Sequence, residues 1–162
     1  MAGGPIGPSS TYFNDTTGRI YPSFYAGATG NISPVGFGAG VKASLDADSV
    51  LEMRFPMPPS LPTGTLKLRS LHLANATSGI IKYTIADGFA GPSDIPGNVT
   101  LTSESQSSVT WNAGDANRYK ETKVSLSSAA SGNAQLVVGV TYQTSGWTLA
   151  TPVTSVHTVI WE

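Results

Sequence analysis

Short segments in which apolar and polar residues alternate, separated by Gly, Pro, Ser and Asn, dominate this chain of 162 residues. In the clearest of them, Leu136, Val138 and Val140 alternate with Val137 and Gly139. A period of two places successive side chains on opposite faces of a β-strand, whereas a helix would need apolar residues three and four apart. The pattern therefore predicts an all-β fold.

The alternating segments recur about every 8–12 residues, which is the spacing of strands in a sandwich or barrel. They cover residues 35–45, 50–55, 66–73, 80–85, 99–101, 109–111, 124–126, 136–142 and 153–161. Because the connecting loops are unequal in length and the pattern indicates about eight to ten strands, a two-sheet jelly-roll sandwich is the predicted architecture.

Two places interrupt this pattern. Leu66 and Leu68 occupy even positions, but Leu71 and Leu73 occupy odd ones. This change of phase predicts either a bulge near residue 70 or a strand that is buried on both faces. Residues 112–121 are the one stretch that favours a helical turn.

Residues 1–33 differ from the rest of the chain. They contain six Gly, three Pro and two charged residues, but five of the chain's fourteen aromatic residues: Tyr12, Phe13, Tyr21, Phe24 and Tyr25. Aromatic side chains left in water forgo roughly 1.5–3 kcal/mol of burial each, so something is expected to cover them. Either they pack on their own domain, or the segment is an extended arm that docks on a neighbouring subunit. The predicted division is an arm over residues 1–33, carrying these five aromatics as candidate interface residues, and a jelly roll over residues 34–162.

The composition excludes several classes of function. Charged residues make up 12% of the chain and its net charge is −1, so no basic field exists to attract nucleic acid. The absence of Cys excludes disulfides, thiolate metal sites and a cysteine nucleophile. No apolar stretch is long enough to span a bilayer and no secretion signal is recognisable, so we expect a protein made in the cytoplasm and without a membrane partner. A nearly neutral surface suits a protein that packs against neighbours.

The chain offers little for catalysis. Its two histidines, His72 and His157, each lie in a strand pattern without a nucleophile elbow nearby. Asp46, Asp48 and Glu52 form the one close acidic cluster, which could bind calcium but is more typical of a turn. We therefore predict no catalytic residue, no cofactor and no metal site, and a protein that is not an enzyme.

The aromatic residues of the predicted sandwich have two interpretations. Trp111, Trp147 and Trp161, together with Tyr119 and Tyr142, could form a platform on which sugars stack. The plainer interpretation is that they pack in the core or in an interface.

Several segments resemble a group of small phage and metagenomic-phage proteins. They are residues 48–69 (DSVLEMRFPMPPSLPTGTLKLR), 73–79 (LANATSG), 145–150 (SGWTLA) and 160–162 (IWE). The resemblance runs over about residues 48–162 and leaves the first 47 residues outside it. These proteins are similar in size and all-β pattern to the jelly-roll decoration, or cement, proteins of phage heads, which are often trimers.

The resemblance implies a virion structural protein on the capsid surface. Its partners would be the major capsid protein and copies of itself in a homotrimer, and it would be made in the host cytoplasm. The alternative is a glycan-binding module of a tail fibre or baseplate appendage. The matched motifs carry over no catalytic residue.

Overall fold

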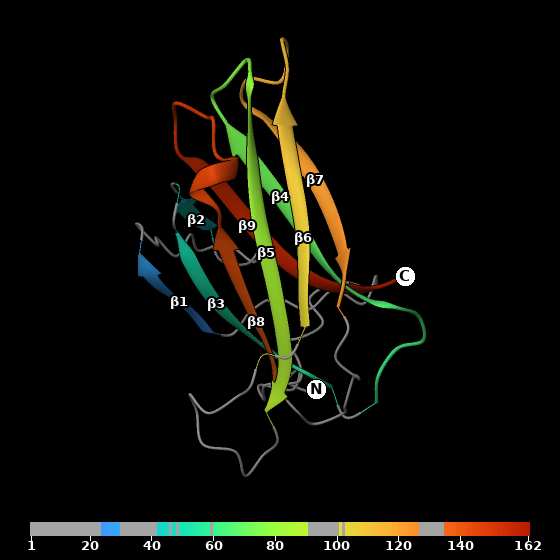
Figure 1. Ribbon diagram of the computed structural model, residues 1–162. Coiled ribbons are helices and arrows are strands. Elements are labelled where there is room, and N and C mark those ends of the chain that lie inside the picture. Colours follow the sequence, from blue (N-terminus) through green and yellow to red (C-terminus); the bar gives the residue numbers. More distant parts are fainter. Residues whose placement is uncertain are drawn as a thin grey trace, which may run out of the picture.

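A computed structural model describes residues 24–29, 42–45, 47, 49–58, 60–90, 101, 103–126 and 135–162. These residues form nine strands and one short 3₁₀ turn, η1 (Thr144–Gly146) (Figure 1). The strands are β1 (Phe24–Thr29), β2 (Lys42–Leu45), β3 (Val50–Pro56), β4 (Leu66–Ala74), β5 (Gly79–Ala90), β6 (Ser103–Trp111), β7 (Arg118–Ser125), β8 (Gln135–Tyr142) and β9 (Val153–Trp161).

The strands form two antiparallel sheets that pack face to face (Figure 1). The five-stranded sheet has the order β1-β3-β8-β5-β6, and the four-stranded sheet has the order β2-β9-β4-β7. Successive described strands alternate between the two sheets, except that β5 is followed by β6 in the same sheet. This wrapping of paired strands across two sheets is the jelly-roll arrangement, so the predicted all-β sandwich is confirmed.

Period-two alternation builds the core between the sheets. In β3, Leu51, Met53 and Phe55 are fully buried, while the residues between them are half-exposed. The same alternation in the other central strands contributes Leu68, Ile81, Ile85, Leu136, Val138, Val140, Val153 and Val159 to the core. In β3 and β5 the buried face is thus the one that the apolar residues indicate.

The expected bulge in β4 is absent. The register of β4 with both of its neighbours is continuous past Ser70, and its even positions face the interior from Leu66 to Ala74. Ser70 and His72 are therefore buried, whereas Leu71 and Leu73 are half-buried on the outer face. The apolar phase changes because two polar residues occupy core positions, not because the strand is irregular.

The expected helical turn over residues 112–121 was also wrong. A tight turn joins β6 to β7, and β7 begins at Arg118. The backbone N–H of Asn112 donates to the Asp115 carboxylate over 2.7 Å, and the Asp115 N–H donates to the Asn112 carbonyl over 3.0 Å. Asn117, with φ of 60°, takes the left-handed conformation that Asn tolerates in turns. Side-chain to backbone hydrogen bonding thus replaces helical bonding here.

Strand β1 lies within the segment predicted to be an arm. It pairs with β3 from Phe24 opposite Arg54 to Thr29 opposite Val50. The sandwich therefore includes six residues that the sequence assigned to the arm. Residues 1–23 and 30–41 lie outside the described part of the chain.

Two of the sequence motifs described above, residues 73–79 and residues 145–150, meet in space. The Ile80 N–H donates to the Thr148 hydroxyl over 2.9 Å, and the Thr148 N–H donates to the Ile80 carbonyl over 2.9 Å. Next to this contact, Gly79 has φ of +124° and lies against the Leu149 side chain. The motif around residues 73–79 and the motif at residues 145–150 thus form one corner of the fold.

Replacing Gly79 with Ala should destabilise this corner. The new Cβ would lie 2.6 Å from Leu149 Cδ2, and the backbone has a conformation that L-residues rarely adopt. We expect Gly79→Ala to lower the free energy of unfolding by about 2–3 kcal/mol in chemical denaturation. Gly114→Ala is the matched control, because Gly114 also has a positive φ, +92°, but has no atom within 4 Å of the added Cβ. Equal losses in the two variants would show that the contact with Leu149 contributes nothing.

Candidate functional site

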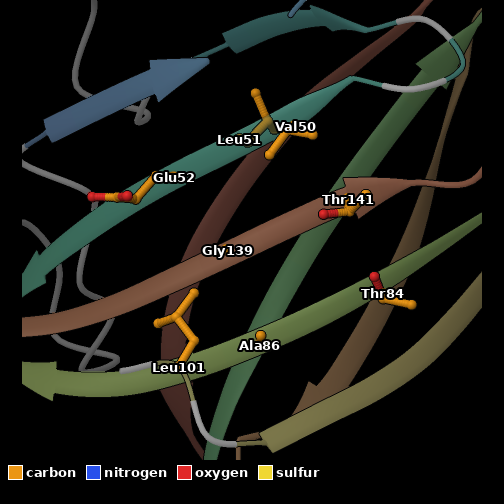
Figure 2. A pocket seen from close by; sticks show the side chains of 8 residues that line it. All are labelled: Val50, Leu51, Glu52, Thr84, Ala86, Leu101, Gly139 and Thr141. Carbon is orange, nitrogen blue, oxygen red and sulfur yellow. The ribbon is translucent and has the colours of Figure 1, made fainter. Parts of the chain in front are cut away.

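A shallow hollow of about 270 Å³ opens on the outer face of the five-stranded sheet (Figure 2). It lies over β3, β8 and β5. Its lining residues are Val50, Leu51, Glu52, Thr84, Ala86, Leu101, Gly139 and Thr141.

Small residues at the centre of the sheet create this hollow. Two rows of neighbouring residues cross the three strands: Glu52, Gly139 and Ala86 in one row, and Val50, Thr141 and Thr84 in the other. Because the first row has no side chain on β8 and only a methyl group on β5, the surface dips between the larger side chains around it. A Gly within a strand often marks such a place of close approach.

Leu101 lies over one end of the hollow. A Cβ on Gly139 would be 2.9 Å from Leu101 Cδ1, and Figure 2 shows the leucine side chain reaching across the sheet toward Gly139. Leu101 is 37% exposed, and Tyr119 on β7, at 55%, is the other large hydrophobic residue exposed in the described part of the chain. One of the two exposed apolar side chains therefore lines the hollow.

The polar groups of the hollow are one paired carboxylate and two hydroxyls. The guanidinium of Arg54 donates to the Glu52 carboxylate from Nε over 3.0 Å and from Nη2 over 2.9 Å, so the one carboxylate at the rim is paired. The hydroxyls of Thr84 and Thr141 lie on the second row. This arrangement can receive an uncharged or apolar group, but its lining holds no nucleophile beside a base.

The predicted arm residues lie partly outside the described chain. Tyr12, Phe13 and Tyr21 fall in its undescribed part, and Phe24 and Tyr25 begin β1 opposite Arg54 and Met53. The strand that contains Phe24 and Tyr25 therefore pairs directly with β3, which supplies one side of the hollow. The sequence did not indicate this neighbourhood.

The tryptophans do not gather on an exposed face. Trp111 is 1% exposed in the core, and Trp161 packs partly buried against it. The Trp147 indole N–H donates to the Leu149 carbonyl over 3.0 Å. Its ring meets that of buried Tyr142 edge-on, with the ring centroids 5.9 Å apart. The three tryptophans therefore pack in or against the core, which is the plainer of the two interpretations.

Both histidines lie in a buried polar cluster between the sheets. His157 Nδ1 lies 2.8 Å from the Ser70 hydroxyl, and His72 Nδ1 lies 2.8 Å from the Ser155 hydroxyl. His72 Nε2 lies 3.3 Å from the Tyr83 hydroxyl, and the two histidine rings are 6.0 Å apart. His157 Nε2 has no hydrogen-bond partner among the described residues.

Burial controls the ionisation of this cluster. Desolvation lowers the pKa of His157 from 6.5 to about 4. Desolvation, with a smaller contribution from nearby His157, holds the pKa of His72 well below its usual value. Both rings are fully buried, so the two Ser–His contacts are out of reach of a substrate. Sequence reasoning placed each histidine in a strand pattern but missed the cluster, because the pairing of β4 with β9 that brings the two together cannot be inferred from local alternation.

The acidic cluster considered for calcium is only partly described. Asp46 and Asp48 lie outside the described residues, and Glu52 is paired with Arg54. In the portion of the chain that the structure describes, no three His, Asp or Glu side chains come together as a metal site would require. The same portion has no helix of the length and apolarity needed to cross a membrane.

Comparisons with known proteins show only a weak likeness in fold. No protein family model matches the chain, and no curated protein matches it. A solved structure of TmCBM61 in complex with β-1,4-galactotriose, a carbohydrate-binding module, matches 86% of this chain and 88% of its own, with 13% sequence identity and a TM-score of 0.42. A likeness of this size carries no information about a ligand of this chain, and the jelly roll is defined by the strand order itself.

Proposed function

We propose that this protein is a non-enzymatic structural component of a phage particle, a decoration or cement protein that binds the major capsid protein on the surface of the head. Its copies form trimers. The outer face of the five-stranded sheet is the docking surface, and the N-terminal arm reaches across subunit boundaries.

The position of Leu101 carries this proposal. An exposed apolar side chain beside a hollow floored by Gly139 and Ala86 lets a partner approach the sheet closely and cover it. Buried apolar anchors at the centre of a contact supply most of its binding free energy. Strand β1, which lies within the predicted arm, pairs with β3 beside this hollow, so the arm and the hollow can engage one partner together.

Introducing a charge at the apolar residue Leu101 tests the docking surface. We expect Leu101→Asp to weaken binding to purified capsids by about tenfold or more, because a carboxylate would be buried in the contact. Tyr119→Asp is the matched control, since Tyr119 is the other exposed large hydrophobic and lies on the other sheet. Binding is measured by co-sedimentation with capsids. Equal loss in both variants, or none in Leu101→Asp, would contradict this docking surface.

Removal of the arm tests its separate role. Because residues 24–29 belong to the sheet, the deletion should end at residue 22 so that β1 remains intact. We expect this truncated protein to fold and to lose at least about tenfold in capsid affinity, since its aromatic contacts are gone. A full-length variant with Tyr12, Phe13 and Tyr21 replaced by Ser should show the same loss. Undiminished binding of both proteins would contradict the arm's role.

Glycan binding on a tail fibre or baseplate is the second candidate. The observation that favours it is that Thr84, Thr141 and Glu52 all line the hollow, since hydroxyl and carboxylate groups bind sugar hydroxyls. Binding on a glycan array that is lost in Thr141→Arg but kept in Thr77→Arg would favour this candidate. Both threonines are exposed, and Thr77 lies in the turn before β5, away from the hollow.

A further inference from the structure

Strand β6 ends the five-stranded sheet as far as the described strands show. It pairs with β5 over nine consecutive positions, from Gly79 opposite Trp111 to Asp87 opposite Ser103, without a bulge. Along its other edge, the peptide groups of alternate residues therefore point away from the sheet. A long, regular edge of this kind is a template for pairing with another strand.

The charges on β6 and β7 differ sharply. β7 ends the four-stranded sheet at the same side of the sandwich (Figure 1). It carries Arg118, Lys120, Glu121 and Lys123, and charged side chains of this kind discourage edge-to-edge pairing. Residues 105–111 of β6 carry no charge and no Pro. The edge of β7 is thus protected by charge against pairing with another strand, and the edge of β6 is not.

We propose that β6 pairs antiparallel with β6 of a second copy of this chain, about a two-fold axis, to join two five-stranded sheets into one. This contact goes beyond the proposed function and does not depend on what the hollow binds. Since a two-fold contact cannot occur within a cyclic trimer, in an assembly of trimers it links subunits of neighbouring trimers.

The sequence of β6 suits pairing with itself. Residues that lie opposite each other in a sheet point to the same face. An odd position of one β6 must therefore face an odd position of the other β6, and an even position an even one, if the core-facing residues of both copies are to stay on the inner face. The two-fold axis then passes through a residue, such as Ser107 or Ser108. Around that centre the opposed residues are Ser, Gln, Val and Thr, and Glu104 falls opposite Thr110 or Asn112. No like charges meet, and hydroxyl and amide groups can hydrogen-bond across the strands. The exposed Gln106, Ser108 and Thr110 offer neither a charge nor an apolar pocket that would select a different chain.

The expected contact is weak in dilute solution. A single added strand falls below the roughly 1,000 Å² buried by stable interfaces. Copies held on a common surface would pair more readily, because their effective concentration is higher. The test must therefore detect a transient pair.

Cross-linking of single cysteines provides this test, because the natural chain has no Cys. Ser108→Cys places a thiol near the proposed axis, and Ser125→Cys places one at an equally exposed position on the charged edge β7. With a short bis-maleimide and about millimolar purified protein, we expect Ser108→Cys to form covalent dimers at least about tenfold faster than Ser125→Cys. Adding Gln106→Lys to Ser108→Cys should reduce that rate to the level of the control, because two lysines would then flank the axis.

Two results would overturn the proposal. They are equal rates for Ser108→Cys and Ser125→Cys, and a rate unaffected by Gln106→Lys. Circular dichroism and denaturation of each variant show that the fold is kept. Because the purified protein is used alone, failure here is distinguishable from failure of capsid binding.

Discussion

Acidification from pH 7 to pH 5 is expected to lower the free energy of unfolding by about 2 kcal/mol through His157 alone, with His72 adding to the loss. Burial depresses the pKa of both rings in the folded protein, to about 4 for His157. Between these values and the ordinary 6.5, the unfolded chain binds protons that the folded protein does not. Stability is therefore fully present above pH 6.5 and falls as the pH drops below it.

The structure explains why the folded protein resists protonation. A charged His157 carries a proton on both ring nitrogens, and its Nε2 has no acceptor among the described residues. A charge on His157 would in turn disfavour a charge on His72, whose ring centroid lies 6.0 Å away. Hydrogen bonds from Lys120 and Lys123 lower the pKa of Asp115 and Glu162 respectively, so these two carboxyl groups titrate below this pH window.

Denaturant titrations of the wild type and of His157→Asn at pH 7, 6 and 5 check this prediction. The substitution will itself change stability, so the quantity of interest is the slope with pH, which should fall by about 1 kcal/mol per pH unit. His72→Asn is the matched control for the other ring, and the double variant should lose the dependence in this window. Histidine NMR resonances that titrate near pH 6.5 in the folded protein would contradict the assignment.

Replacement of Trp111 by Ala is expected to lower the free energy of unfolding by about 3–5 kcal/mol. The side chain is 1% exposed, belongs to the core cluster and leaves a large cavity when truncated. Its indole N–H has no hydrogen-bond partner among the described residues. Trp111→Phe should therefore cost much less, because it keeps an aromatic ring and removes an unpaired buried donor.

Tyr119→Ala provides the comparison for Trp111→Ala. Tyr119 is 55% exposed on the outer face, so its removal should change stability by no more than about 0.5 kcal/mol. Thermal and chemical denaturation followed by circular dichroism measure both changes. A stable Trp111→Ala protein that had lost sugar binding would instead support the glycan-binding alternative.

The sequence predicted few of the residues that line the hollow. Gly139, the one Gly among the alternating residues of its strand, was the available sign of a close approach. Nothing local indicated that Glu52, Ala86 and Leu101, distant in sequence, would surround it. Composition set residues 1–33 apart as rich in aromatic residues, but that residues 24–29 form β1 beside the hollow required knowledge of strand pairing.

The amino-acid sequence by itself determined most of the strands and the two-sheet sandwich, although not that residues 24–29 form a strand, because alternation with a period of two is a local property that sets which face of a strand is buried. Only the tertiary structure decided which strands are neighbours, since pairing depends on contacts between residues far apart in the chain. It also decided that Ser70 and His72 face inward, because β9 supplies Ser155 and His157 as their hydrogen-bond partners. A polar side chain can occupy a core only where such a partner exists, and that partner lies more than eighty residues away.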